Sequence, residues 1–326
     1  MEQIIIPQNH PHHSEIKSLI GILLSIIDAD SVYVSSVNNG QQTKTLICLI
    51  LKKETSEKTD ELYGIIKELL EHYPRYICKI FDAERTAYSF RKGNLFFICH
   101  CSVRELVYRA TPSSPIFNPT VTEIDQVVQK AKKHHIKECE QIHAVSRDLA
   151  MFIRNGNHLQ AAYILHETIW ELYHCASWFL AGISISSKSI IQQQSHISDY
   201  SCLLGTLFEI YDEDDANLLQ ELNSACDAVC QNFDIPISRG IIPNATAKAE
   251  FLKQEIKRLF EENMQICKDK FSQPMINNER AGEEPKEPAY EDESIIQILI
   301  TISDRLLECL KMLNEMFLDN QKENAI

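Results

Sequence analysis

Three prolines stand within eight residues of this chain, at positions 112, 115 and 119 of 326. Proline lacks the backbone N–H group and has a fixed φ, so neither a helix nor a central strand can run through this stretch. Before it, helical and strand patterns alternate, whereas after it all patterns are helical. We therefore predict a boundary here, with one domain over 1–115 and a second over 120–271.

The segment before the boundary predicts a small domain built on a mixed sheet. Apolar side chains recur at helical spacing in 14–28, and Asn38-Asn39-Gly40 is a hairpin signal between two strand-like runs. The expected elements are a helix over 14–28, strands over 31–37 and 45–51, a helix over 57–72, and strands over 76–81 and 95–101. Such an order is typical of a small α/β domain.

The segment after the boundary predicts a helical bundle, and the whole chain is therefore expected to be α+β. An acidic, proline-containing stretch at 272–293 predicts a flexible linker, and an apolar stripe predicts an amphipathic helix over 294–326. The expected bundle helices span 121–154, 158–182, 197–211, 214–232 and 246–271.

The strongest motif lies in the second bundle helix, which reads AAYILHETIWELY over 161–173. Aromatic and polar side chains follow one another at intervals of three and four residues, which places them near one face of the helix. Flat rings that carry polar atoms suit a groove for a planar ligand, although Tyr163 and His166 could equally be hydrogen-bonded core residues with His174 in solvent. The candidate groove residues are Tyr163, His166, Glu167, Trp170, His174 and the later His196.

This helix resembles the one that defines the HEPN family, in which an aromatic residue precedes a His-Gln pair and a later His opens the next helix. The resemblance covers about residues 120–271 and implies a bundle that forms homodimers, although Glu167 stands where an amide is usual. HEPN proteins that cut RNA carry an Arg, four to six residues and a His near the end of the bundle. Here the last His is His196, and Arg154 with His158 falls one residue short. We expect no RNase activity, because the general base is missing.

The segment 14–110 resembles a nucleotidyltransferase domain in its order of elements. That chemistry needs two carboxylates on one strand to hold Mg²⁺, and the matching strand here, 44–49, reads KTLICL. The nearest acids, Asp82 and Glu84, stand at the end of another strand. The resemblance therefore implies a catalytically inactive version, and we expect no cofactor.

Net charge, metal-ligand spacing, hydropathy and cysteine usage limit the partners, metals and cellular compartment that can be expected. The net charge of −14 argues against nucleic acid as a partner. His135, Cys139 and His143 share a helical face at a zinc-like spacing, but a fourth ligand is not evident, so we predict no metal. The longest apolar run is too short to span a membrane. The 11 cysteines stand among apolar residues without an export signal, which predicts reduced thiols and a cytoplasmic protein.

The sequence thus predicts a non-catalytic protein that binds a nucleotide-like ligand or a protein partner. We expect a homodimer, formed through the bundle or through the helix over 294–326. One alternative is an enzyme that uses unusual residues, with Asp82, Arg154 and His158 as candidates. Another is one component of a toxin–antitoxin pair.

Overall fold

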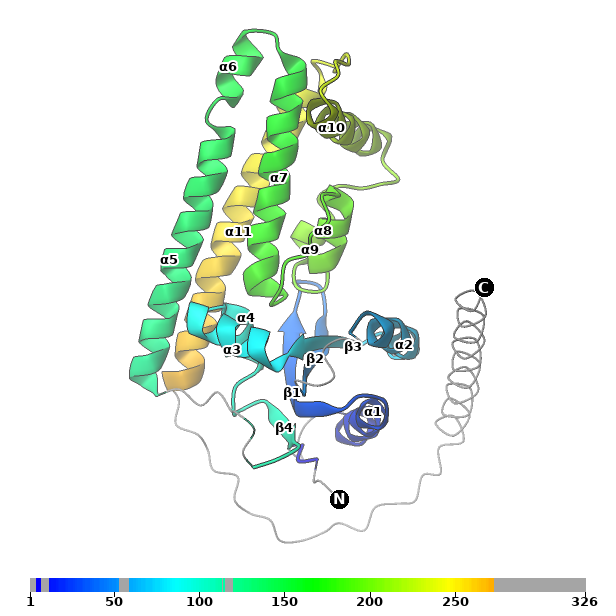
Figure 1. Ribbon diagram of the computed structural model, residues 1–326, viewed down its shortest axis with the longest axis vertical. Coiled ribbons are helices and arrows are strands. Elements are labelled where there is room, and N and C mark those ends of the chain that lie inside the picture. Colours follow the sequence, from blue (N-terminus) through cyan, green and yellow to red (C-terminus); the bar gives the residue numbers. More distant parts are fainter. Residues whose placement is uncertain (1–3, 7–11, 53–58, 113, 115–119, 273–326) are drawn as a thin grey trace, which may run out of the picture. The chain divides into compact units, whose positions relative to one another are not determined.

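The computed structural model describes residues 4–6, 12–52, 59–112, 114 and 120–272 (Figure 1). The fold is α+β, with a four-stranded mixed sheet near the N-terminus followed by helices. All described residues belong to one compact unit, Met1–Met275. The predicted linker, apart from Ser272, and the predicted helix over 294–326 lie outside the described residues.

The sheet has the strand order β3-β2-β1-β4. β1 pairs antiparallel with β2 and β4, and β2 pairs parallel with β3. The predicted hairpin between β1 and β2 is confirmed, because Asn38 Oδ1 accepts from the N–H of Gly40 and Asn39 Oδ1 accepts from the two following amides. The strands are β1 (Ala29–Asn38), β2 (Thr43–Leu51), β3 (Tyr76–Asp82) and β4 (Leu106–Arg109).

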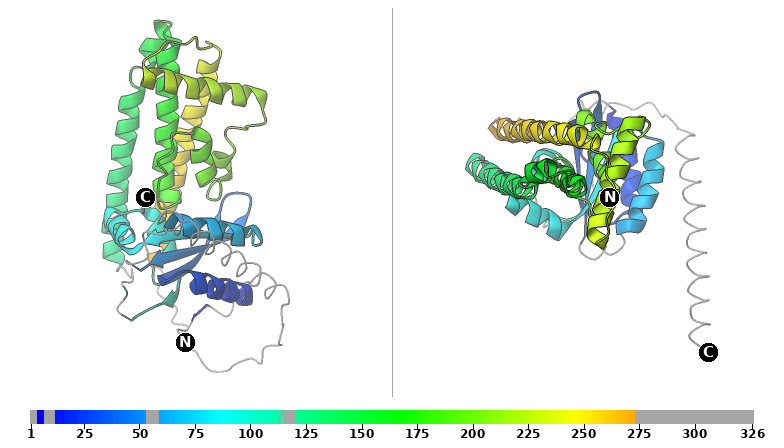
Figure 2. Two further views of the ribbon diagram at one scale, coloured as in Figure 1. Left: turned by 45° about the vertical axis from the view of Figure 1, so that its right-hand side comes forward. Right: turned by 90° about the horizontal axis from the view of Figure 1, so that it is seen from above.

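β2 is buried on both faces, which explains its continuous apolar sequence. Leu46, Cys48 and Ile50 belong to the hydrophobic cluster shared with the bundle, whereas the alternate residues of β2 are buried outside that cluster. α1 (His13–Ile26) and α2 (Thr59–Glu71), both predicted, lie on one face of the sheet (Figures 1 and 2). α3 (Ala83–Lys92) and α4 (Leu95–His100) lie on the opposite face.

The predicted strand over 95–101 is wrong, because this segment forms α4. Gly93 ends α3 with φ of 83°, and Asn94 caps α4 by accepting from the N–H of Phe96. The five residues from Leu95 to Cys99 are all buried between sheet and bundle, so their apolar run carries no helical period. β4, which the sequence did not predict, takes the sheet edge beside β1.

Two predicted bundle helices differ from the observed ones, the last helix begins five residues earlier than predicted, and the helix Ile190–Ile197 was not predicted. The predicted helix 121–154 is interrupted at Arg147 and Asp148, which separates α5 from α6. The predicted helix 197–211 is wrong, because the Gln194 side chain bonds both the N–H and the carbonyl of Phe208 and so competes with helical pairing there. The bundle helices are α5 (Val121–Ser146), α6 (Leu149–Arg154), α7 (His158–Leu180), α8 (Ile190–Ile197), α9 (Cys202–Gly205), α10 (Glu213–Gln231) and α11 (Ile241–Ser272).

α4 joins the sheet to the bundle. The buried Asn94 donates from Nδ2 to the carbonyl of Gly182, which follows α7, over 3.0 Å. The sulfurs of Cys99 on α4 and Cys267 on α11 are 2.8 Å apart and buried. Sheet and bundle therefore share one hydrophobic core. Among the described residues, no helix combines the length and the apolar character needed to cross a membrane.

Candidate functional site

α7 is the central helix of the bundle, and one line of half-buried side chains runs along it. The helix begins after Asn157, whose side chain accepts from the N–H of Gln160. Most of its residues are buried. The α7 stripe, as we call the half-buried line, contains both tryptophans of the chain and consists of Tyr163, Glu167, Trp170, Glu171, His174 and Trp178.

Trp170 is held by the loop between α7 and α8. Its indole Nε1 donates to the carbonyl of Ser187 over 2.8 Å. The Lys188 ammonium lies 3.5 Å from the centroid of the same ring, which is a cation–π contact. The His174 ring is 5.1 Å away on the next turn of the helix, tilted by 36°. Trp170 therefore presents a fixed, partly covered ring at the surface.

Glu167 contacts both an exposed side chain, Lys188, and a buried one, His166. Lys188 Nζ lies 2.9 Å from its Oε2, and His166 Nδ1 lies 3.4 Å from its Oε1. The contact with the His166 ring, together with Lys188, outweighs partial burial and lowers the pKa of Glu167 to about 2. Glu167 is therefore a carboxylate at neutral pH.

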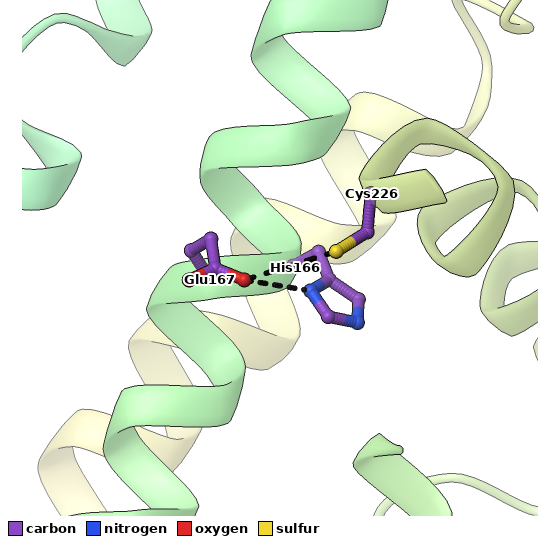
Figure 3. Close-up of side chains that lie close together, drawn as sticks. All are labelled: His166, Glu167 and Cys226. Carbon is purple, nitrogen blue, oxygen red and sulfur yellow. Dashed lines mark hydrogen bonds and ion pairs between the residues drawn. The ribbon is translucent and has the colours of Figure 1, made fainter. Parts of the chain in front are cut away.

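His166 lies on the buried side of α7 rather than in the stripe. Its side chain is 2% exposed, and Nδ1 has no hydrogen-bond partner because its contact with Glu167 has the distance of an ion pair without hydrogen-bond geometry. Cys226 of α10 completes the cluster, with Sγ 3.8 Å from Glu167 Oε1 (Figure 3). Desolvation, and then the charge of Glu167, raise the pKa of this thiol to about 12.

The remaining predicted groove residues are divided between two places. Tyr163 and His174 stay in the stripe, and desolvation shifts the pKa of Tyr163 up and that of His174 down. His196 lies elsewhere, near the end of α8 rather than at the start of a helix. Its ring is 3.0 Å from the carbonyl of Ile183, and desolvation, with the charge of Lys79, lowers its pKa. The predicted groove residues are thus not all in one groove.

A small cavity lies at the far end of the stripe, beside Trp178. Its volume of about 10 Å³ gives room for about one water molecule. His134 stacks on Trp178, with ring centroids 5.3 Å apart, and His135 stacks on Phe260 at 3.9 Å. Desolvation lowers the pKa of His135 to about 4. The cavity is too small for a nucleotide.

The residues proposed for enzymatic alternatives have structural roles. Asp82 is the N-cap of α3, where its side chain accepts from the N–H of Arg85. Arg154 is the last residue of α6 and donates to the carbonyl of Ala150, whereas His158 is the first residue of α7. Among the described side chains, no hydrogen bond or ion pair joins Arg154 to His158.

Cations stand near the strand where a nucleotidyltransferase would carry its carboxylates. Lys44 of β2 pairs with Asp199 at 2.8 Å. Lys79 of β3 is attracted by Asp199 as well, and desolvation lowers its pKa. The hairpin turn is bonded to the same loop, since Cys202 donates its N–H to the carbonyl of Asn39 over 2.8 Å.

Sequence reasoning missed Lys188 and Cys226. Both contact Glu167 from positions 21 and 59 residues further along the chain. The spacing of Cys226 and Cys230 at i, i+4 on one helix was a usable signal for Cys226. Comparisons with protein-family models and with curated proteins find no match for this chain.

Proposed function

We propose that this chain is a non-catalytic, HEPN-type binding protein that associates with a second copy of itself through the α7 stripe. The observation that carries the proposal is the position of the two tryptophans. Trp170 and Trp178 both stand half-buried in one line on the central helix of the bundle. Tryptophan is enriched at the centres of protein interfaces, and a ring left partly exposed still has apolar area to bury.

A second copy is the partner that the local charges favour. A two-fold interface uses one surface twice, so it must be complementary to itself. The stripe carries the acids Glu167 and Glu171, and the cation Lys188 lies beside it. Desolvation raises the pKa of Glu171, the charge of Lys188 in the same chain opposes this shift, and Glu138 and Glu167 add to it. A further cation that approaches would therefore stabilise this carboxylate. Two-fold pairing offers such a cation in the partner's Lys188.

The charges at one end of the sheet support the proposal that the protein is not catalytic. Lys44 and Lys79 place two ammonium groups around Asp199, where a divalent cation would need a net negative site. Incubation of the full chain with ATP, Mg²⁺ and labelled RNA should therefore yield no product. A product that disappears with Asp82→Ala or His158→Ala would overturn this part of the proposal.

Association can be measured by sedimentation equilibrium of the full chain over a concentration series. Because the chain has two tryptophans and both are in the stripe, their fluorescence should shift to the red as dilution separates the dimer. Glu171→Lys should weaken the dimer at least tenfold, since it places a second cation opposite Lys188. Glu250→Lys, a charge reversal on the exposed face of α11, is the matched control and should leave association unchanged.

Two results would overturn the homodimer. One is a wild-type chain that stays monomeric throughout the series. The other is a Glu171→Lys chain that associates as the wild type does, which would place the contact elsewhere, for example on the predicted helix over 294–326. A monomer that instead retains a different protein through the stripe would favour the toxin–antitoxin alternative.

A further inference from the structure

A second cluster shares Glu167 with the stripe and extends from it towards the buried side of α7. It combines an imidazole, a carboxylate and a thiol, contributed by His166 and Glu167 of α7 and by Cys226 of α10. One ligand atom from each residue lies within 4.8 Å of the other two. Figure 3 shows the three side chains converging between the two helices.

The buried imidazole points to a missing partner. A buried ring nitrogen without a hydrogen bond is costly, and native proteins seldom leave one unsatisfied. His166 Nδ1 is such a nitrogen: the side chain is only 2% exposed, and Nδ1 has no hydrogen-bond partner. This nitrogen lies 3.4 Å from Glu167 Oε1. A bound cation at this point would satisfy the nitrogen, the carboxylate oxygen and the sulfur together.

The two separations that involve Glu167 Oε1 are close to those around a tetrahedral zinc ion, and the third pair of atoms lies within 4.8 Å. Zinc bond lengths of about 2.0 to 2.3 Å at tetrahedral angles separate nitrogen from oxygen by about 3.3 Å, and oxygen from sulfur by about 3.6 Å. The observed separations are 3.4 Å for His166 Nδ1 to Glu167 Oε1 and 3.8 Å for Cys226 Sγ to the same oxygen. Small side-chain rotations would bring all three atoms to bonding distance of one ion.

Cys230 is the candidate for the fourth ligand. It lies one turn after Cys226 on α10, close enough for the two thiols to influence each other. Ligands at i and i+4 of a helix can bind the same metal. Cys230 is exposed, so an ion can enter from its side.

The charges also balance. Two thiolates and the Glu167 carboxylate contribute −3, and the ion with the neighbouring Lys188 contributes +3. Lys188 holds Oε2 of Glu167, which leaves Oε1 for the metal. Thiolate and imidazole ligands in tetrahedral array favour zinc over magnesium or calcium.

We propose that His166, Glu167, Cys226 and Cys230 form a structural Zn²⁺ site that connects α7 to α10. On binding, the ion takes the place of the two thiol protons, which are released to solvent. The site shares Glu167 with the stripe, but all its ligands come from one chain, so it does not require the homodimer.

The other His–Cys cluster fits one ion poorly. His135 Nε2 lies 3.6 Å from Cys139, whereas its Nδ1 lies 3.6 Å from Cys175. The two nitrogens of one ring point in different directions, so a single ion cannot be bound by both sulfurs and the ring together. Cys139 is therefore a suitable control thiol.

The experiment is titration of metal-free, full-length chain with Zn²⁺ against a chromophoric chelator, and with Co²⁺ followed by absorbance. Wild type should bind one ion per chain, and Co²⁺ should give a thiolate-to-cobalt charge-transfer band. Cys226→Ser should weaken zinc binding by about 100-fold or more and remove the band. Cys230→Ser, an exposed change that leaves the core intact, should weaken binding by about tenfold. Cys139→Ser should bind as wild type.

Several outcomes would overturn the site. The proposal is wrong if the wild-type chain binds neither Zn²⁺ nor Co²⁺, or if Cys226→Ser binds zinc with wild-type affinity. Loss of binding in Cys139→Ser would move the metal to the His135 cluster. Unchanged affinity in Cys230→Ser would overturn the fourth ligand. Urea unfolding of each metal-free variant shows whether a loss of binding has its origin in a loss of folding.

Discussion

Gly93→Ala tests how closely the N-terminal part of the chain is packed against the bundle. Gly93 has φ of 83°, and an added Cβ would lie 2.7 Å from Ala131 N and 2.7 Å from Val127 O, both backbone atoms of α5. Alanine in the left-handed region costs about 1–2 kcal/mol. The overlap adds about 1–3 kcal/mol, because α5 can yield only by moving as a helix. The sum is about 2–5 kcal/mol of unfolding free energy.

Gly156→Ala supplies the matched control. Gly156 has φ of 70°, and an added Cβ would have no atom within 4 Å, so this variant carries the backbone cost alone. Urea unfolding followed by circular dichroism gives both free energies, and the melting temperature of Gly93→Ala should fall by roughly 10 °C. If the two variants lose equal stability, α5 does not approach Gly93, and the close contact between the end of α3 and α5 is wrong.

Three further changes test individual contacts. Desolvation, with the charge of Lys270, lowers the pKa of His100 to about 3 in the folded chain, whereas an unfolded histidine has a pKa of about 6.5. Below about pH 6.5 the unfolded chain therefore binds a proton that the folded chain does not, and the free energy of unfolding falls as the pH drops. His100→Gln should flatten this fall by at most about 1.4 kcal/mol per pH unit, and parallel curves from urea unfolding at pH 5 and 7 would contradict it. Tyr173→Phe removes the buried hydroxyl that donates to Gln194 and should cost about 1–2 kcal/mol, measured by thermal unfolding. Asn94→Ala removes the α4 cap and the bond to Gly182, and should cost about 2–3 kcal/mol in the same assay; a neutral result would refute the junction.

Local sequence patterns predicted most helices and strands. They failed where contacts with distant parts of the chain determine the secondary structure. The hairpin at Asn38-Asn39-Gly40 was predictable because its turn chemistry is local. The run from Leu95 to Cys99 was not, because a short segment buried on all sides has the same composition as a strand or a helix. The loop over 206–212 was missed because Gln194, more than ten residues away, bonds both backbone groups of Phe208 within it.

Helical geometry explains why the predicted groove residues of α7 do not all lie along one line. At 100° per residue, each interval of four residues rotates a side chain by about 40°, so His174 lies about 80° around the helix from His166. His166 is accordingly buried while His174 is half-buried. The observed stripe alternates intervals of four and three, from Tyr163 through Glu167 and Trp170, which keeps it on one side. The HEPN resemblance, the domain boundary and the homodimer stay predictions.

The loop between α7 and α8 matters to both proposed sites, although it has no regular secondary structure. Its carbonyls are bound at close intervals: Gly182 by Asn94, Ile183 by His196, Ile185 and Ser187 by Gln193, and Ser187 again by Trp170. Bonds from three different elements leave the backbone little freedom before Lys188. The Lys188 ammonium is therefore delivered to a defined place, where it covers Trp170 and binds Glu167. Lys188 thus acts on Glu167, which belongs both to the stripe and to the metal cluster. The two proposals are separated by changing Glu171, which belongs only to the stripe, or Cys226, which belongs only to the cluster.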